Sequence, residues 1–209
     1  MNVFDKPIVM IDFETTGLSP DMGDRITEVA ALRIVGGRVV ERYVSLINCN
    51  VRIPSFITGL TGITQAMVDG APSVAQVMPA LLDFIGEDAL SAHNASFDEK
   101  FLRAEAARLG LTPAHQGLVC SLKLARRVFP QLSSYKLGNL SGQLGIAFKS
   151  AAHRAESDAE VAAEVLIHIG HHIGRTYGIT EVDPALLQSV NKLAAAKVHQ
   201  FLQRQAPPV

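Results

Sequence analysis

An apolar run that ends in two carboxylates is the feature that most constrains this fold. Residues 7–13 are apolar except for Asp12, which predicts a strand buried on both faces of a sheet. Glu14 follows two positions later, so both carboxylates lie on the same face of that strand. Two carboxylates on one buried face repel each other and are costly to desolvate. A divalent metal ion between them offsets this free-energy cost. The alternative is a strand end with solvated acids before a Thr-Thr-Gly turn, and this stretch alone leaves both interpretations open.

The following elements predict a mixed sheet. Residues 26–35 and 38–47 have the pattern of strands and flank Gly36-Gly37, a pair typical of a β-hairpin. Apolar residues at helical spacing cover 73–85, and a short buried strand follows at 89–94. Further helices are predicted at 96–110, 121–130, 136–146, 155–174 and 184–203. Three antiparallel strands followed by alternating helices and strands indicate an α/β fold, with a mixed sheet flanked by helices.

The composition fits a single domain inside a cell. The chain has 209 residues, of which 48% are hydrophobic and 19% are charged, so it can bury a sizeable core. Cys49 and Cys120 stand far apart without a Cys/His cluster, so we expect no structural zinc site and a reducing compartment. The first residues do not resemble a signal peptide, and no run reaches the roughly 18 apolar residues of a membrane span. We therefore expect a cytoplasmic protein without a membrane segment.

Two more acids and a histidine occupy the ends of predicted elements. Asp98 lies in the first turn of a helix directly after a buried strand, where α/β sheets usually build their sites. Its alternative role is to stabilise the positive end of the helix dipole. His153 precedes Asp158 by five residues at the start of a long amphipathic helix. Taken alone, such a loop histidine is usually just an exposed side chain.

Three separated motifs carry a resemblance to a known family. They are DFETTG at 12–17, HNASFD at 93–98 and HRAESD at 153–158. In this order and spacing they are similar to the motifs of the DnaQ-like 3′–5′ exonucleases of the DEDD superfamily. These include the epsilon proofreading subunits of DNA polymerase III and RNase T. The last motif is the histidine (DEDDh) form, because the tyrosine form needs Tyr where Arg154 stands. Two weaker family features, LTGIT and KLGNLSGQLGI, start at residues 60 and 136.

The resemblance implies a fold and an activity. The fold is RNase H-like, with an exonuclease domain at 1–175 and a C-terminal helical extension at 176–209. The activity is hydrolysis of phosphodiester bonds at the 3′ end of single-stranded nucleic acid, which releases nucleoside 5′-monophosphates. His153 is then the general base, carried on a loop of small residues at 150–152 that would let it move towards the substrate. The ligands of two divalent ions, Mg²⁺ or Mn²⁺, are then Asp12, Glu14, Asp98 and Asp158.

The same resemblance implies a pocket for the terminal nucleotide. Its predicted substrate-binding residues are Thr15, Thr16, Leu18, Leu60, Thr61, Asn94, Phe97 and Arg154. Epsilon-type subunits often carry His where Thr61 stands, so this contact departs from the family pattern. The alternative for Leu18, Leu60 and Phe97 is ordinary core packing, and Asn94 is expected to hold the loop before Asp98 through local hydrogen bonds.

An acid-free segment supports a polyanionic substrate better than the net charge of −1 does. Residues 106–155 contain no Asp or Glu, and a basic run of this kind suits contact with a phosphate backbone. Its alternative role is a solvated basic face. The cations of the segment are Arg108, Lys123, Arg126, Arg127, Lys136, Lys149 and Arg154.

Other functions fit the sequence less well. A phosphatase that forms an aspartyl-phosphate needs a second Asp where Glu14 stands and has no use for His153. A catalytically silent nucleic-acid-binding module would not need every reactive position filled. A proofreading subunit that works only within a DNA polymerase stays open, and the helix from Pro184 could pack on its own domain, on a second copy in a homodimer or on such a partner. A free-standing exonuclease is favoured, acting on DNA or RNA.

Overall fold

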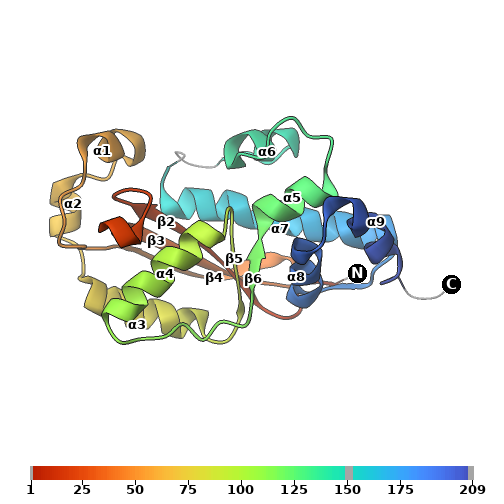
Figure 1. The fold of residues 1–209 in the computed structure, drawn as a ribbon, viewed down its shortest axis with the longest axis horizontal. Coiled ribbons are helices and arrows are strands. Elements are labelled where there is room, and N and C mark those ends of the chain that lie inside the picture. Colours follow the sequence, from red (N-terminus) through yellow and green to blue (C-terminus); the bar gives the residue numbers. More distant parts are fainter. Residues whose placement is uncertain (1, 149–152, 207–209) are drawn as a thin grey trace.

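The computed structural model describes residues 2–148 and 153–206, and a five-stranded mixed sheet forms its centre (Figure 1). The strand order is β4-β3-β2-β5-β6. Strand β2 pairs antiparallel with β3, and β3 with β4, whereas β2, β5 and β6 run parallel. This confirms the predicted α/β fold with an antiparallel start and parallel strands after it.

The elements of the described chain are bounded as follows. The strands are β1 (Asn2–Val3), β2 (Ile8–Thr15), β3 (Ile26–Val35), β4 (Arg38–Leu46), β5 (Ala89–Ala92), β6 (Leu118–Cys120) and β7 (Glu181–Val182). The helices are η1 (Pro20–Met22), α1 (Ser55–Thr61), α2 (Gln65–Asp69), α3 (Val74–Ile85), α4 (Ser96–Arg108), α5 (Ser121–Val128), α6 (Leu137–Gln143), α7 (Ala155–Tyr177), α8 (Pro184–Lys192) and α9 (Ala195–Gln203).

Strand β2 lies in the middle of the sheet and separates two apolar layers. Met10 packs in the layer that contains α7, and Ile11 packs in the opposite layer with α3 and α4. Because successive side chains of a strand point to opposite faces, Asp12 and Glu14 continue the row of Met10. Both acids are therefore directed to the α7 side of the sheet, at the end where β2 finishes.

The hairpin between β3 and β4 turns at Gly36 and Gly37, as predicted. Both glycines have positive φ angles, 59° and 72°, which residues with a Cβ rarely adopt and which a tight two-residue hairpin requires.

The predicted single helix at 184–203 is wrong, because two helices occupy this region. Leu193 and Ala194 are extended, with ψ angles of 153° and 142°, and they separate α8 from α9. The carbonyl of Leu193 accepts a hydrogen bond of 2.9 Å from Arg127 Nε on α5, a partner outside the helix. Buried residues of both helices, such as Leu187 and Leu202, belong to the same apolar cluster as α7.

The shortest elements were not predicted from the sequence. Strands β1, β6 and β7 and helices η1 and α2 have two to five residues, too few to show a period of 2.0 or 3.6. Among the described residues, no helix is both long and apolar enough to cross a membrane.

Candidate metal centre and nuclease site

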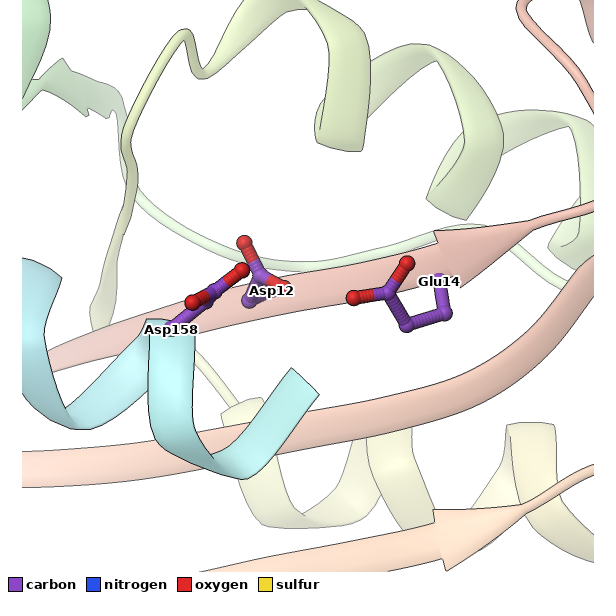
Figure 2. A group of neighbouring side chains, drawn as sticks. All are labelled: Asp12, Glu14 and Asp158. Atoms are coloured by element: carbon purple, nitrogen blue, oxygen red, sulfur yellow. The ribbon is translucent and has the colours of Figure 1, made fainter. Parts of the chain in front are cut away.

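Three carboxylates converge where β2 passes the start of α7. Figure 2 shows Asp12 and Glu14 on the strand, with Asp158 reaching them from the first turn of the helix. One carboxylate oxygen from each residue lies within 4.8 Å of the others. All three side chains are half-buried. A cluster of hard oxygen donors at this separation suits a divalent cation such as Mg²⁺ or Mn²⁺.

The β2 backbone changes register beside these acids. The ladder to β3 shifts between Glu14 and Thr15, an irregularity that β-sheets commonly carry next to functional sites. The shift ends the regular pairing directly after the second acid, so the chain can leave the sheet and turn over the site.

Asp98 is buried beside the three-carboxylate group but is not part of it. Only 3% of the residue is exposed, and its carboxylate accepts hydrogen bonds from its own backbone and from that of Phe13. These bonds tie the first turn of α4 to β2. The charge of Asp98 raises the pKa of Asp12, so the two carboxylates interact electrostatically.

The pKa values of all four acids are raised. Burial and then the charges of Asp98, Asp158 and Glu14 hold the pKa of Asp12 well above its usual range. Burial raises the pKa of Glu14 to about 7 and that of Asp98 to about 8. Burial also raises the pKa of Asp158. Within the described part of the chain, none of the four forms an ion pair with Lys or Arg. A bound cation would stabilise their charged forms.

His153 lies at the rim of this group. The residue is exposed and has a left-handed backbone, with a φ of 61°. Its backbone N–H donates a hydrogen bond of 3.3 Å to Asp158 Oδ2, which leaves the imidazole free of that contact. Residues 150–152, on which the predicted loop movement rests, lie outside the described residues.

A buried ion pair that was not predicted from the sequence holds the start of α7. Glu28 on β3 lies opposite Glu14 in the sheet and is 3% exposed. Its Oε1 lies 2.5 Å from Arg154 Nη2, and its Oε2 accepts a bond of 2.9 Å from the N–H of Ala155. The guanidinium of Arg154, predicted to bind substrate, therefore has a protein partner. The signal for this pair is an acid inside the buried apolar run of residues 26–35.

The turn after β2 is fixed by hydrogen bonds of its threonines. Thr15 Oγ1 donates to the carbonyl of Gly17 at 2.6 Å, and Thr16 Oγ1 lies 3.4 Å from Asp24 Oδ1. A Cβ added at Gly17 would lie 2.4 Å from Asp24 Oδ1, so a side chain there would displace the carboxylate that bonds Thr16 and Ser19. Leu18, at the tip, is 82% exposed, which excludes the alternative role in the core.

Leu60 and Thr61 are the last residues of α1, and they differ in how accessible their side chains are to a substrate. Leu60 is 52% exposed. Thr61 is buried, and its hydroxyl donates to the carbonyl of Ile57 and accepts from the N–H of Ile63. These bonds hold the Thr61 hydroxyl inside the helix end.

Asn94 and Phe97 shape the connection that leads to Asp98. Asn94 has a φ of 73°, a conformation that Asn tolerates, and its carbonyl accepts a bond of 2.9 Å from the N–H of Phe97. Phe97 is half-buried and its ring packs against Phe101 at a centroid distance of 5.0 Å.

Comparison with known proteins agrees with this geometry. A family model described as exonuclease, RNase_T, matches residues 9–166. The chain belongs to this DnaQ-like exonuclease family. It is a nuclease enzyme, and the resemblance inferred from its three motifs is confirmed.

Two curated relatives differ in the share of their own length that the chain covers. It is 34% identical over 178 residues to the DNA polymerase III subunit epsilon of Aquifex aeolicus, covering 85% of this chain and 87% of the relative. It is 37% identical over 157 residues to the PolC-type DNA polymerase III of Clostridium perfringens, covering 75% of this chain and 11% of the relative. The chain thus spans about a tenth of the PolC-type relatives and most of the epsilon subunit.

Solved structures share the fold. Exonuclease X in complex with 5′ overhanging duplex DNA superposes with a TM-score of 0.68 at 27% identity, covering 88% of this chain and 99% of that one. The nuclease domain of 3′hExo, a DEDDh family member bound to rAMP, also has a TM-score of 0.68, at 22% identity, and covers 79% of this chain and 92% of that one. The fold is therefore that of the RNase H-like exonucleases.

Proposed function

We propose that this protein is a metal-dependent 3′–5′ exonuclease that acts on single-stranded nucleic acid and releases nucleoside 5′-monophosphates. The observation that carries the proposal is the group of three carboxylate oxygens within 4.8 Å, with buried Asp98 beside it and no ion pair to Lys or Arg among the described residues. Asp12, Glu14, Asp158 and Asp98 would hold two divalent ions, Mg²⁺ or Mn²⁺. Such ions, when bound, stabilise the attacking and leaving oxygens of an in-line displacement.

In this proposal the chain's own residues position and deprotonate the water. His153 takes a proton from the attacking water, whose oxygen forms the new bond to phosphorus. The bond between phosphorus and the 3′ oxygen of the preceding nucleotide breaks, and that oxygen gains a proton to become the new 3′ hydroxyl. The hydrogen bond from the backbone N–H of His153 to Asp158 would hold the general base next to a metal ligand.

The terminal nucleotide would lie between the turn after β2 and the end of α1. Leu18 and Leu60 are exposed apolar side chains that can pack on its base and sugar. The Phe97 ring and the backbone of Thr15, Thr16 and Asn94 would complete this pocket. Thr61 and Arg154 would contribute through the elements they fix, because their polar groups bond Ile57, Ile63 and Glu28.

The test is a paired digestion. Purified protein with Mg²⁺ or Mn²⁺ receives 5′-labelled single-stranded DNA and RNA of the same sequence, beside an Asp12→Ala control. The proposal predicts a ladder that shortens from the 3′ end and is absent with the control. Interior cleavage, or equal activity in the control, would contradict it, and the faster substrate identifies the preferred sugar.

A second candidate is a proofreading subunit that works within a DNA polymerase. The similarity to an epsilon subunit along 87% of that subunit favours it. Under this candidate the isolated chain digests a mismatched 3′ end slowly, and a replicative polymerase added to the reaction accelerates the digestion.

A further inference from the structure

We propose that the groove between α5 and α6 binds backbone phosphates of the strand that lies 5′ of the cleaved nucleotide. This inference rests on the proposed exonuclease function and adds a path for the rest of the substrate. The groove has a volume of about 720 Å³. Its polar lining includes His93, Asn94, Arg126, Ser133, Ser134 and Lys136, and no Asp or Glu is among the described residues that line it.

The two cations of the groove differ from others in the acid-free segment. Arg126 and Lys136 are exposed and form no ion pair within the described ranges. Arg126 lies over the ring of Tyr135, 5.8 Å from its centroid, which holds the guanidinium without neutralising it. An unpaired guanidinium and an ammonium match the chemistry of a phosphodiester backbone. The hydroxyls of Ser133 and Ser134 beside them bond Gln143 and Asn139.

The other cations of this segment are engaged elsewhere or do not line the groove. Arg108 pairs with Glu105, and Arg154 pairs with Glu28. Arg127 donates to backbone carbonyls, including that of Leu193. Lys123 is exposed on α5 but does not line the groove, and Lys149 lies outside the described residues. Of the cations in residues 106–155, Arg126 and Lys136 are therefore the two that we assign to phosphate binding.

Hydrogen bonds of His93 connect the elements that form the wall of the groove, and the chain continues from this wall to Asp98. His93 Nδ1 lies 2.9 Å from Ser121 Oγ, and its Nε2 lies 2.9 Å from the carbonyl of Tyr135, so the imidazole ties β5 to α5 and to the segment before α6. Burial lowers the pKa of His93, which fits a neutral structural role. Asn94 follows it at the groove and precedes Asp98, in the first turn of α4, by four residues.

The test separates the groove from the catalytic centre by substrate length. The short substrate is the p-nitrophenyl ester of thymidine 5′-monophosphate, which fills only the terminal position. The long substrates are single-stranded DNA and RNA of 2 to about 12 nucleotides. The double variant Arg126→Gln/Lys136→Gln is compared with Lys192→Gln/Lys197→Gln, which removes two exposed cations from the C-terminal helices.

We expect the groove variant to hydrolyse the ester at the wild-type rate. Its kcat/KM on the longest strands falls on the order of a hundredfold, about tenfold for each lost charged contact. The slope of log(kcat/KM) against log[salt] becomes shallower by about 1.4, or 0.7 for each phosphate contact on a single strand. The control variant Lys192→Gln/Lys197→Gln should keep the wild-type kcat/KM on long strands and the wild-type salt dependence. A loss for DNA and RNA alike indicates phosphate recognition, and a loss for one only adds recognition of its sugar.

Two results would overturn the inference. One is an equal loss on the ester and on long strands, which places the effect in the catalytic centre. The other is wild-type activity of the groove variant on every length. If the wild-type enzyme digests neither kind of substrate, the proposed function fails. The groove is then judged by fluorescence anisotropy of a labelled 12-nucleotide strand, where unchanged affinity of the variant rejects it.

Discussion

Two sets of buried or half-buried carboxylates lie on β2 and on the elements packed against it, and the two sets differ in their partners. The paired acids, Glu28 and Glu105, are 3% and 1% exposed, and each bonds an arginine side chain. The unpaired acids, Asp12, Glu14, Asp98 and Asp158, form no ion pair with Lys or Arg in the described ranges. A buried carboxylate that serves structure is paired with a cation of the protein, whereas an unpaired one has a raised pKa and lowers stability unless a cation from solution binds it.

The paired acids also position the unpaired ones. Arg25, directly before β3, bonds Glu105 through Nε and Nη2 at 2.7 and 2.8 Å, and Glu105 lies on α4, the helix that carries Asp98. The ion pair between Glu28 and Arg154 fixes the start of α7, the helix that carries Asp158. Each arginine pair thus anchors one helix that brings an acid to β2.

The largest expected effect follows from removing an unpaired acid. Asp12→Asn should lower the rate of single-strand digestion by at least about a thousandfold, because a metal ligand supplies several kcal/mol of transition-state stabilisation. Single-turnover digestion measures this loss, and circular dichroism of the same sample verifies the fold. Digestion within tenfold of the wild-type rate would place the metal elsewhere.

The next effect concerns the histidine at the rim. His153→Ala should lower kcat by about 10²–10⁴-fold, the range of general base catalysis. Mn²⁺ affinity should stay within about twofold, because the backbone N–H that bonds Asp158 remains in the variant. Calorimetric titration with Mn²⁺ and digestion kinetics give the two numbers. Full activity of the variant would remove His153 from the mechanism.

Removing a paired acid should lower the stability of the fold, whereas removing an unpaired acid should lower the rate of digestion. Glu105→Ala leaves Arg25, only 19% exposed at its side chain, without its partner, and should lower the free energy of unfolding by about 3 kcal/mol. The matched control on the same helix is Arg103→Ala, which breaks a more exposed pair with Glu99 that contributes at most about 0.5 kcal/mol. Urea unfolding compares them, and equal losses would show that burial of the Glu105 pair is immaterial.

The last prediction concerns the way in which the stability of the metal-free protein depends on pH. Burial raises the folded pKa values of Glu14 and Asp98 from 4.5 and 3.8 to about 7 and about 8. Between these limits the folded state binds more protons than the unfolded state, so stability falls as pH rises. We therefore expect the free energy of unfolding in EDTA to decrease from pH 4 to pH 8, as measured by urea unfolding. A rise over this interval would contradict the assigned shifts.

The sequence predicted the parts of this molecule that local patterns encode. The buried apolar run of β2, the Gly36-Gly37 hairpin and the long helix from Ala155 follow from local composition, residue periods and turn chemistry, and the structure has all three. The alternation of side chains along a strand also explains why Asp12 and Glu14 share the face that α7 covers. The convergence of Asp158 with them came from the family motifs, since no local pattern relates residues this far apart.

The features that the sequence did not predict depend on tertiary partners. Glu28 and Arg154 are separated by 126 residues, so their pairing has no local period. The break between α8 and α9 coincides with a bond from Arg127 to the Leu193 carbonyl, which helical spacing cannot foresee. The sequence also could not decide whether Leu18 is exposed, because an apolar residue in a turn can face either the core or a ligand.

The most direct test of the central claim is urea unfolding at pH 8 of the wild-type protein and Asp12→Asn, each in EDTA and in saturating Mn²⁺. The claim is that the fold leaves the unpaired acids without a cation of its own so that a metal ion can bind them. It predicts that the variant is the more stable protein in EDTA. At a hundredfold excess over its dissociation constant, Mn²⁺ should stabilise the wild type by about 2.7 kcal/mol per site, and the order should reverse. A variant that is less stable in EDTA, or a wild type that Mn²⁺ does not stabilise, would contradict the claim.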